Sequence, residues 1–321
     1  MHVLLVKTSS LGDVIHNLPV VSDLVRAHPG ITIDWCVEEA FAEIPRLHPG
    51  VGEVIPVALR RWRKAPFAGK TWSEIGACRR QLRHQAYDII LDTQGLVKSA
   101  LIASQARGTR YGYAAGVARE PFAARFYDRH FVIPNNANAV LRNRWLAAAA
   151  FDHPVDLPLD YGIAAPEQPL PWLPGHTQGK HAVLLTATSR DDKLWHEESW
   201  AHIARELVAQ GILPVLPSGS PRERERAARI AAGAPGACVA PPLRLRELAT
   251  LIGQSCVAVG VDTGLVHLAA ALSIPSIALY TATDPERTGV LGSGFFRNLG
   301  GPGHPPSTQA VLSAIHQGLN A

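Results

Sequence analysis

The stretch VLLVKTSSLGDVIH, residues 3–16, decides the fold class. Its four consecutive aliphatic residues predict a buried strand, and the turn-forming residues 8–10 lead into a helical pattern over 12–27. The same order of strand and helix recurs up to residue 150 and begins again at residue 181. Strands that alternate with helices predict an α/β fold with mostly parallel sheets.

The apolar patterns predict the following elements. In the first half we expect strands at 3–7, 31–37, 54–57, 87–92 and 130–133, and helices near 12–27, 38–47, 71–84, 96–105 and 137–150. In the second half we expect strands at 181–187, 212–216, 256–261 and 276–280, and helices near 197–210, 221–232, 243–252, 264–272 and 307–319.

A proline-rich stretch separates the two halves. Residues 151–180 contain six prolines, among them Pro174, and proline lacks the backbone donor that a helix or sheet needs. We therefore expect a linker between an α/β domain at 1–165 and a second at 166–321, with the last helix, 307–319, packing back on the first domain. Ligands of open α/β sheets bind beyond the carboxyl ends of the strands, so we expect a cleft there.

Composition excludes several classes of protein. Of the 321 residues 47% are hydrophobic and 18% charged, and no apolar run approaches the ~18–20 residues of a membrane-spanning helix. The start, Met1–Lys7, has no basic leader, so we expect a soluble, cytoplasmic chain. The four cysteines lie far apart, and there is no DxD pair or metal-ligand spacing, so we expect neither a zinc site nor a required metal or cofactor.

The net charge of +4 is concentrated in one segment. Up to residue 160 the chain has 19 basic and 15 acidic residues, whereas the remainder has 12 of each. Residues 60–83 hold eight basic side chains against the single acid Glu74. This density predicts a site for a polyanion; the alternative is a solvated basic helix and loop.

The turn after the first strand lacks both common phosphate-binding motifs. It has neither GxGxxG nor the GK[ST] ending of a P-loop, which disfavours an ordinary Rossmann oxidoreductase and a P-loop kinase. It does place Asp13 at the amino end of a helix. Such an acid either complements the helix dipole or acts in catalysis, and this segment alone leaves both possibilities open.

Loops of the second half combine hydroxyls, cations and a glycine. Thr188 and Ser189 precede Lys193 after a strand, a set that suits a diphosphate. A helix begins at the sequence Asp262-Thr263-Gly264, which provides either an anion site or an ordinary N-cap. His267 follows one turn later, either as a ligand contact or as a half-buried histidine whose hydrogen bonds are made within the protein. Glu223 can bind a ribose or belong to a solvated helix start.

The chain contains four further motifs: Arg60–Lys64 (RRWRK), Asp92–Ser99 (DTQGLVKS), Ala118–Pro121 (AREP) and Thr283–Pro285 (TDP). Together with the motifs above, they occur in an order that resembles the heptosyltransferases of glycosyltransferase family 9. The similarity runs through essentially the whole chain. It implies the GT-B architecture, in which two Rossmann-like parallel-sheet domains face each other across a cleft, the first binding the acceptor and the second the nucleotide-sugar donor. Ser189, Ser218 and Thr281-Ala282 depart from the residues usual in the family.

The resemblance also implies an activity: inverting, metal-independent transfer of L-glycero-D-manno-heptose from ADP-heptose to the first Kdo of Kdo-lipid A, by a peripheral enzyme on the cytoplasmic face of the inner membrane. Asp13 matches the general base and Lys193 the residue that neutralises the departing ADP. The implied donor-binding residues are Thr188, Ser189, Lys193, Glu223, Asp262, Thr263, Gly264 and His267. The implied acceptor-binding residues are Ser10, Gly12, Arg60, Arg61, Arg63, Lys64 and Arg119.

Two alternatives remain at this point. Another family 9 enzyme, acting on an already heptosylated acceptor, shares the same donor and base motifs. A basic nucleic-acid-binding protein also interleaves arginines with aromatic residues such as Trp62 and Trp72, although we expect no nucleic-acid partner here.

Overall fold

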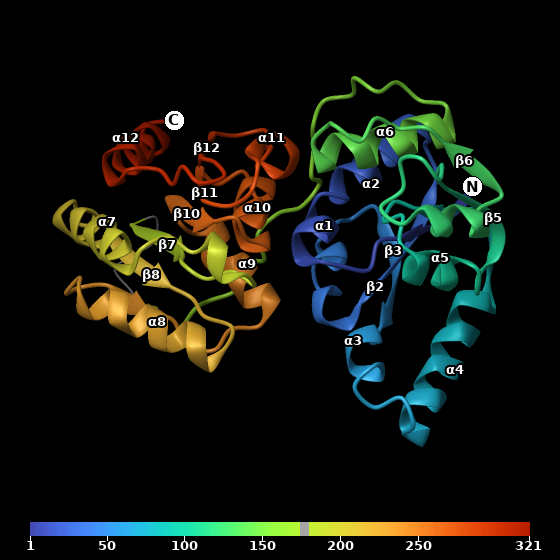
Figure 1. The fold of residues 1–321 in the computed structure, drawn as a ribbon, viewed down its shortest axis with the longest axis horizontal. Coiled ribbons are helices and arrows are strands. Elements are labelled where there is room, and N and C mark those ends of the chain that lie inside the picture. The colour runs from blue at the N-terminus through green and yellow to red at the C-terminus, as the bar shows by residue number, and fades with distance from the viewer. Residues whose placement is uncertain (174–179) are drawn as a thin grey trace. The chain divides into compact units, whose positions relative to one another are not determined.

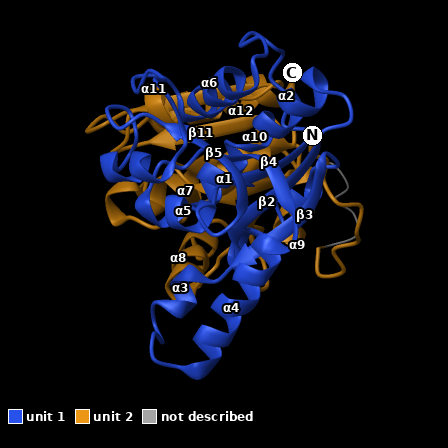
Figure 2. Ribbon diagram, turned by 90° about the vertical axis from the view of Figure 1, so that its right-hand side faces the viewer, with its two compact units in different colours: residues 1–162 blue, residues 163–321 orange. Residues whose placement is uncertain are grey.

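The computed structural model describes residues 1–173 and 180–321 and divides the chain into two compact units. They comprise Met1–Gly162 and Ile163–Ala321, coloured separately in Figure 2, so the division falls three residues before the expected boundary. Residues 152–170 contain no helix or strand, in keeping with the expected linker, whose residues 174–179, with Pro174, lie outside the described residues.

The first unit is built on a six-stranded parallel sheet of order β3-β2-β1-β4-β5-β6 (Figure 1). Its strands are β1 (His2–Val6), β2 (Thr32–Glu38), β3 (Val51–Val57), β4 (Ala86–Asp92), β5 (Arg107–Tyr113) and β6 (Arg129–Phe131). Its helices are α1 (Leu11–Ile15), α2 (Leu18–Ala27), α3 (Leu59–Trp62), α4 (Gly69–His84), α5 (Val97–Ala103) and α6 (Ala139–Phe151). The central β1 is aliphatic because neighbouring strands and the layers on both faces bury it.

The second unit repeats this plan in the order β12-β11-β10-β7-β8-β9. Its strands are β7 (His181–Leu185), β8 (Leu213–Leu216), β9 (Cys238–Val239), β10 (Val257–Val261), β11 (Ser276–Tyr280) and β12 (Phe296–Gly300). Its helices are α7 (Glu197–Ala209), α8 (Pro221–Ala232), α9 (Leu245–Gly253), α10 (Gly264–Ala271), α11 (Pro285–Thr288) and α12 (Thr308–Leu319).

The last helix lies on its own unit. Its buried residues Val311, Leu312 and Ile315 belong to the core of the second unit, and α12 packs against α7, β10, β11 and β12. Helix α12 therefore covers an apolar face of the second sheet, and its expected packing on the first domain stays a prediction.

Two predicted helices of the first unit differ from the structure, and one strand was not predicted. The helix expected at 38–47 is wrong: only two 3-10 turns form, and Pro45 begins the second. The helix expected at 12–27 is two helices, with Pro19 in the first turn of α2. Strand β5 was not predicted because RGTRYGY has no apolar alternation; Gly112 stands there because a Cβ would lie 2.4 Å from the Tyr127 ring.

The sheet register of the first unit brings two loops together. Strands β1 and β4 are parallel neighbours with Val6 opposite Asp92, so the segments that follow them leave the sheet side by side. These segments begin at Lys7 and Thr93, and they contain most of the polar residues described next.

Candidate active site

The two loops at the carboxyl ends of β1 and β4 are tied together by buried hydrogen bonds. Thr8 donates through both its backbone N and its Oγ1 to Gln94 Oε1, at 2.7 and 2.8 Å, and Gln94 Nε2 donates to the Ser9 carbonyl at 3.0 Å. Lys98 Nζ donates to Ser9 Oγ at 2.9 Å. The turn that carries Asp13 is therefore held rigidly by side chains of the neighbouring loop.

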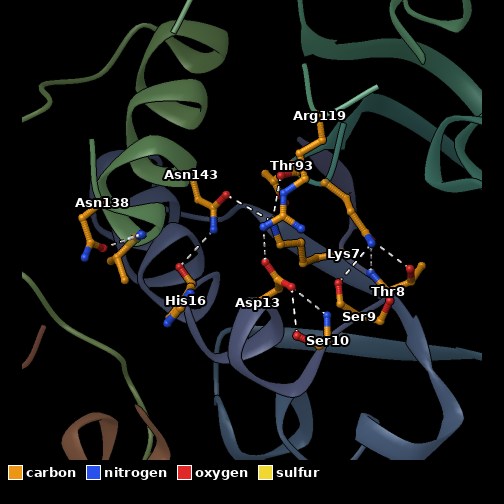
Figure 3. Close-up of polar contacts among 12 residues, drawn as sticks. Lys7, Thr8, Ser9, Ser10, Asp13, His16, Thr93, Arg119, Asn138 and Asn143 are labelled. Atoms are coloured by element: carbon orange, nitrogen blue, oxygen red, sulfur yellow. Dashed lines mark hydrogen bonds and ion pairs between the residues drawn. The ribbon is translucent and has the colours of Figure 1, made fainter. Parts of the chain in front are cut away.

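Asp13 uses its two carboxylate oxygens differently. Oδ2 accepts hydrogen bonds from the backbone N and the Oγ of Ser10, at 2.8 and 3.0 Å, which caps the first turn of α1. Oδ1 accepts from Arg119 Nη2 at 2.8 Å, and Figure 3 shows Ser10 and Arg119 reaching the carboxylate from opposite sides. Asp13 thus serves as a helix-capping acid and also presents one oxygen away from the cap. The structure brings the predicted residues Ser10, Gly12, Asp13 and Arg119 together at this turn.

A buried lysine, Lys7, lies beneath this turn, and no sequence motif predicted a functional role for it. Lys7 is 3% exposed, and its Nζ donates to the Thr93 carbonyl at 2.8 Å and to Asn143 Oδ1 at 3.2 Å. It lines a small hollow with Asp13 and Arg119. The available signal was a lysine that directly follows a fully aliphatic strand, a place where a charged side chain is rarely buried without a partner.

Charges around the hollow act on each other. Burial alone would raise the pKa of Asp13, but the positive charges of Lys7 and Arg119 outweigh it and hold that pKa well below its ordinary value. Burial lowers the pKa of Lys7 to about 8, although the charge of Asp13 opposes this shift. Asp13 is therefore an ionised carboxylate at neutral pH.

The basic segment divides into residues that line a pocket and residues that do not. Arg60 and Arg63 line a pocket of about 470 Å³ together with Ser9 and Lys98, so the segment reaches the loop that carries Asp13. Arg61 instead forms ion pairs with Glu39 and Glu74, at 3.0 and 2.7 Å. Arg61, which was predicted to bind the acceptor, is thus paired with two carboxylates of its own unit, and its role stays a prediction.

The other basic side chains of the segment are exposed. Lys64 lies beyond α3, and α4 presents Lys70, Arg79, Arg80 and Arg83 to solvent. The basic segment thus has two parts: Arg60 and Arg63 line a pocket, whereas α4 is a basic, exposed helix.

In the second unit, Asp262 contacts three of the other predicted donor-binding residues, Lys193, Thr188 and His267. Its Oδ2 accepts from Lys193 Nζ at 2.7 Å and from Thr283 Oγ1 at 2.6 Å, and its carbonyl accepts from Thr188 Oγ1 at 3.0 Å. His267, at 4% exposed, places Nε2 3.9 Å from Oδ1. Thr283 was known from the sequence only as part of a motif.

This cluster keeps Asp262 ionised. Burial opposes its negative charge, but the polar contact of His267 and the hydrogen bonds from Lys193 and Thr283 outweigh burial and hold the pKa of Asp262 far below the ordinary value. The carboxylate therefore neutralises Lys193 and fixes its position at the end of β7.

The helix start at residues 263–264 fits an anion site better than a side-chain cap. Thr263 is the N-cap residue of α10, with extended backbone, yet its side chain makes no capping hydrogen bond. Gly264 is the first helical residue. The backbone N–H groups of this turn are consequently not occupied by the Thr263 hydroxyl.

Glu223 lies in a second pocket, of about 360 Å³, with Thr188 and Ser189. Its Oε2 accepts from the Gly219 backbone N at 2.6 Å, and Ser220 caps the helix on which it lies. Arg226, also in this pocket, pairs with Glu197 at 2.9 Å and was missed because it looked like one of several solvated arginines in RERER. Glu223 is therefore a pocket residue and not only part of a solvated helix start.

Within the described ranges, no three His, Cys, Asp or Glu side chains are grouped so as to hold a metal ion. The four cysteines are free thiols. No helix in residues 1–173 or 180–321 has the length and apolar character needed to cross a bilayer.

A family model for glycosyltransferase family 9 (heptosyltransferase) matches residues 75–299. The chain belongs to this family. It is therefore a glycosyltransferase, and this excludes a non-catalytic nucleic-acid-binding protein as its class.

Characterised relatives extend the match to the amino-terminal residues. The heptosyltransferase is 45% identical over 294 residues to lipopolysaccharide heptosyltransferase 1 of Escherichia coli K12, covering 91% of each chain. It is also 45% identical to the enzyme of the same name from Pseudomonas aeruginosa, covering 91% of this chain and 82% of that protein.

Solved structures confirm the GT-B fold. The E. coli heptosyltransferase WaaC with ADP has a TM-score of 0.90 at 41% identity, covering 99% of this heptosyltransferase and 100% of that chain. The same E. coli protein with ADP-2-deoxy-2-fluoro heptose has a TM-score of 0.87 at 42% identity, covering all of both chains.

Proposed function

We propose that this heptosyltransferase transfers L-glycero-D-manno-heptose from ADP-heptose to the first Kdo of Kdo-lipid A, with inversion at the anomeric carbon and without a metal ion. The observation that carries the proposal is the pair of preorganised sites: an ionised Asp13 beside a basic pocket in one unit, and Lys193 fixed by Asp262 in the other. ADP bound to the E. coli relative supports the donor class.

The acceptor assignment is supported by a comparison between relatives. Identity is 45% to lipopolysaccharide heptosyltransferase 1 of E. coli but 25% to lipopolysaccharide heptosyltransferase 2 of Salmonella typhimurium. Because both relatives are heptosyltransferases, the difference favours the acceptor used by the first. An already heptosylated acceptor is the second candidate.

On the acceptor side, Asp13 acts as general base. An acceptor hydroxyl attacks the anomeric carbon, its oxygen forms the new glycosidic bond, and its proton moves to Asp13. Because the nearby cations lower the pKa of Asp13, the proton transfers late, when the attacking oxygen has become acidic. Ser10 holds the carboxylate in place, and Arg60 and Arg63 bind anionic groups of the acceptor.

On the donor side, the bond between the anomeric carbon and the phosphate oxygen breaks, and ADP leaves with the electron pair. Lys193 neutralises the charge that develops on the diphosphate, while the helix start at Gly264 supplies backbone donors. Glu223 accepts hydrogen bonds from the ribose. Thr188, Ser189, Asp262, Thr263 and His267 complete the donor site.

A transfer assay tests the function directly. The purified protein is incubated with ADP-heptose and either Kdo-lipid A or the same lipid already carrying one heptose. Transfer to the first acceptor alone supports the proposal, whereas transfer only to the second establishes the alternative. The anomeric configuration of the product, read by NMR, tests inversion, and retained activity in excess EDTA tests metal independence.

We also propose that the enzyme works as a peripheral protein on the anionic cytoplasmic face of the inner membrane. Phe67 is 97% exposed and Trp72 is 64% exposed, and they lie among the basic residues of the segment 60–83. Aromatic side chains at the interface and cations at anionic headgroups together favour membrane association.

Vesicle sedimentation tests this location. Wild type is expected to bind vesicles that contain phosphatidylglycerol and to bind phosphatidylcholine vesicles several-fold less. The double variant Phe67→Ser/Trp72→Ser is expected to lose binding while still responding to ADP in a melting assay. Val132→Ser, a change at another exposed apolar residue, serves as the matched control. Equal binding by the double variant and wild type would contradict the proposal.

A further inference from the structure

The two oxygens of the Asp13 carboxylate accept different numbers of hydrogen bonds. Oδ2 already accepts two hydrogen bonds from Ser10, whereas Oδ1 accepts one, from Arg119 Nη2. A carboxylate oxygen offers about two lone-pair sites, so Oδ2 is filled and Oδ1 is the atom left to take a proton. The guanidinium of Arg119 therefore lies on the reactive oxygen.

The backbone of Arg119 is fixed although its side chain is not buried. The next residue, Glu120, donates its N–H to the Gly95 carbonyl at 3.0 Å, and its carboxylate accepts from the Val97 N–H at 2.7 Å. The side chain of Arg119 is nevertheless 48% exposed, against 15% for that of Asp13. The guanidinium can therefore change partner by rotating its side chain, without any movement of the loop.

The second cation near Asp13 has no such freedom. Lys7 is buried and held by Thr93 and Asn143. Asn143 is itself fixed, because its Nδ2 donates to the His16 carbonyl at 3.2 Å. When Arg119 leaves, Lys7 remains nearby, so Asp13 stays ionised while it loses its ion pair with Arg119.

We propose that Arg119 is a movable cap on Asp13: without acceptor it occupies Oδ1, and on acceptor binding it transfers to a carboxylate of the acceptor and exposes Oδ1 to the attacking hydroxyl. The inference rests on the proposed function, because Kdo supplies the carboxylate. It makes Arg119 a positioning residue that couples acceptor recognition to the release of the base, in addition to a contact for the acceptor.

Four basic groups near Asp13 come from four parts of the first unit. They are Lys7 after β1, His16 at the end of α1, Arg119 in the loop after β5, and Arg142 of α6. Arg142 is engaged elsewhere, since it donates to the carbonyls of Pro134 and Val117. Its guanidinium carbon also lies 5.1 Å from the centroid of the Tyr113 ring, within the range of a cation–π contact. Among these cations, Arg119 combines direct contact with Asp13 and substantial exposure.

A two-by-two comparison of protein and acceptor tests the transfer of Arg119 between partners. Wild type and Arg119→Ala are assayed with Kdo-lipid A and with the same acceptor after reduction of the first Kdo carboxylate to a primary alcohol. In wild type, we expect carboxyl reduction to lower kcat about tenfold or more, because Arg119 then stays on Oδ1. In Arg119→Ala, the same reduction is expected to change kcat by less than about threefold.

The pH dependence supplies a second readout that mere binding would not change. In wild type, the acid limb of kcat is expected at higher pH than that of kcat/KM, because the acceptor complex has lost the Arg119 contact to Asp13. In Arg119→Ala the two limbs are expected to coincide. Arg119→Lys keeps the charge with a shorter reach, so the separation of its two acid limbs is expected to lie between that of wild type and that of Arg119→Ala. Arg110→Ala, which disrupts an exposed ion pair with Asp128, is the matched control.

The outcomes separate the two proposals. If wild type does not transfer heptose to Kdo-lipid A, the proposed function is wrong. Two results would contradict the movable cap while the proposed function stands. In the first, wild type transfers heptose, but the losses of kcat from Arg119→Ala and from carboxyl reduction multiply. In the second, both changes affect KM alone, and the acid limbs of kcat and kcat/KM coincide in wild type.

Discussion

The ammonium group of Lys193 lies 2.7 Å from Oδ2 of Asp262, a carboxylate that is only 8% exposed. The pair spans two loops of one sheet, after β7 and after β10, which are neighbouring parallel strands. Without a diphosphate, the lysine is therefore neutralised and fixed by the protein itself. Under the proposed function, we expect a bound diphosphate to share this lysine with Asp262, so that little reorientation is needed when charge develops on the leaving group.

Lys193→Ala is expected to reduce both donor affinity and turnover. Under the proposed function, the lysine would contact the diphosphate before and during bond cleavage, so we expect its loss to affect the ground state and the transition state alike. We expect at least a tenfold weaker ADP affinity by calorimetry and a fall in kcat of at least a hundredfold. Lys180→Ala, an exposed lysine of the same unit, is the control. Unchanged ADP affinity in Lys193→Ala would remove the lysine from the donor site.

Asp13→Asn is expected to abolish transfer while leaving the donor site intact. The amide keeps the size of the side chain but cannot accept the proton, and loss of a general base costs ~10²–10⁴-fold in rate. ADP affinity should stay within a few-fold of wild type, because Asp13 belongs to the other unit. Asp152→Asn, at a left-handed position that asparagine tolerates, is the matched control. Near wild-type turnover would leave Asp13 as a helix cap only.

Much of the fold could be predicted from the sequence because the central strands are buried on both faces. Val3–Val6 and Val257–Val261 read as apolar runs for this reason, and their predicted positions are confirmed. The strands β5 and β12 were not predicted because RGTRYGY and FRNLG contain few apolar residues, and their partners in the sheet, not their own composition, fix them as strands.

The predicted site residues lay after strands, as the fold requires, but their partners could not be predicted. Pairing of Arg119 with Asp13 joins residues 106 positions apart, and pairing of Arg61 with Glu39 and Glu74 depends on how α3 meets the loop after β2. No local pattern encodes such contacts. The sequence similarly contains Lys7 without any indication that Thr93 and Asn143 hold it in place.

Arg144→Ala is expected to destabilise the first unit strongly. Arg144 on α6 forms a bidentate ion pair with Asp23 of α2, and the two side chains are 6% and 2% exposed. Removing one partner leaves a buried, uncompensated charge, which costs about 3–5 kcal/mol. Urea unfolding should show this loss. Arg110→Ala breaks an exposed pair and is expected to cost less than about 1 kcal/mol. Similar losses in both variants would contradict this ranking.

His48 is expected to make stability fall between pH 6.5 and pH 4. The Gly50 backbone N–H donates to Nδ1 at 2.9 Å, so Nε2 carries the proton and donates to Ser22 Oγ, also at 2.9 Å. The ring is thus held neutral, and burial lowers the pKa of His48 from 6.5 to about 4.

The sign of this effect follows from proton binding. Between pH 4 and 6.5 the unfolded chain binds a proton at residue 48 that the folded protein does not bind. The free energy of unfolding therefore rises with pH across this window and decreases as the pH falls. The slope should flatten in His48→Gln and persist in His84→Gln, a change at an exposed histidine of α4. Urea unfolding at half-unit pH steps measures these slopes. An unchanged slope in His48→Gln would show that other groups account for the acid destabilisation, since glutamine at residue 48 has no proton to gain in this range.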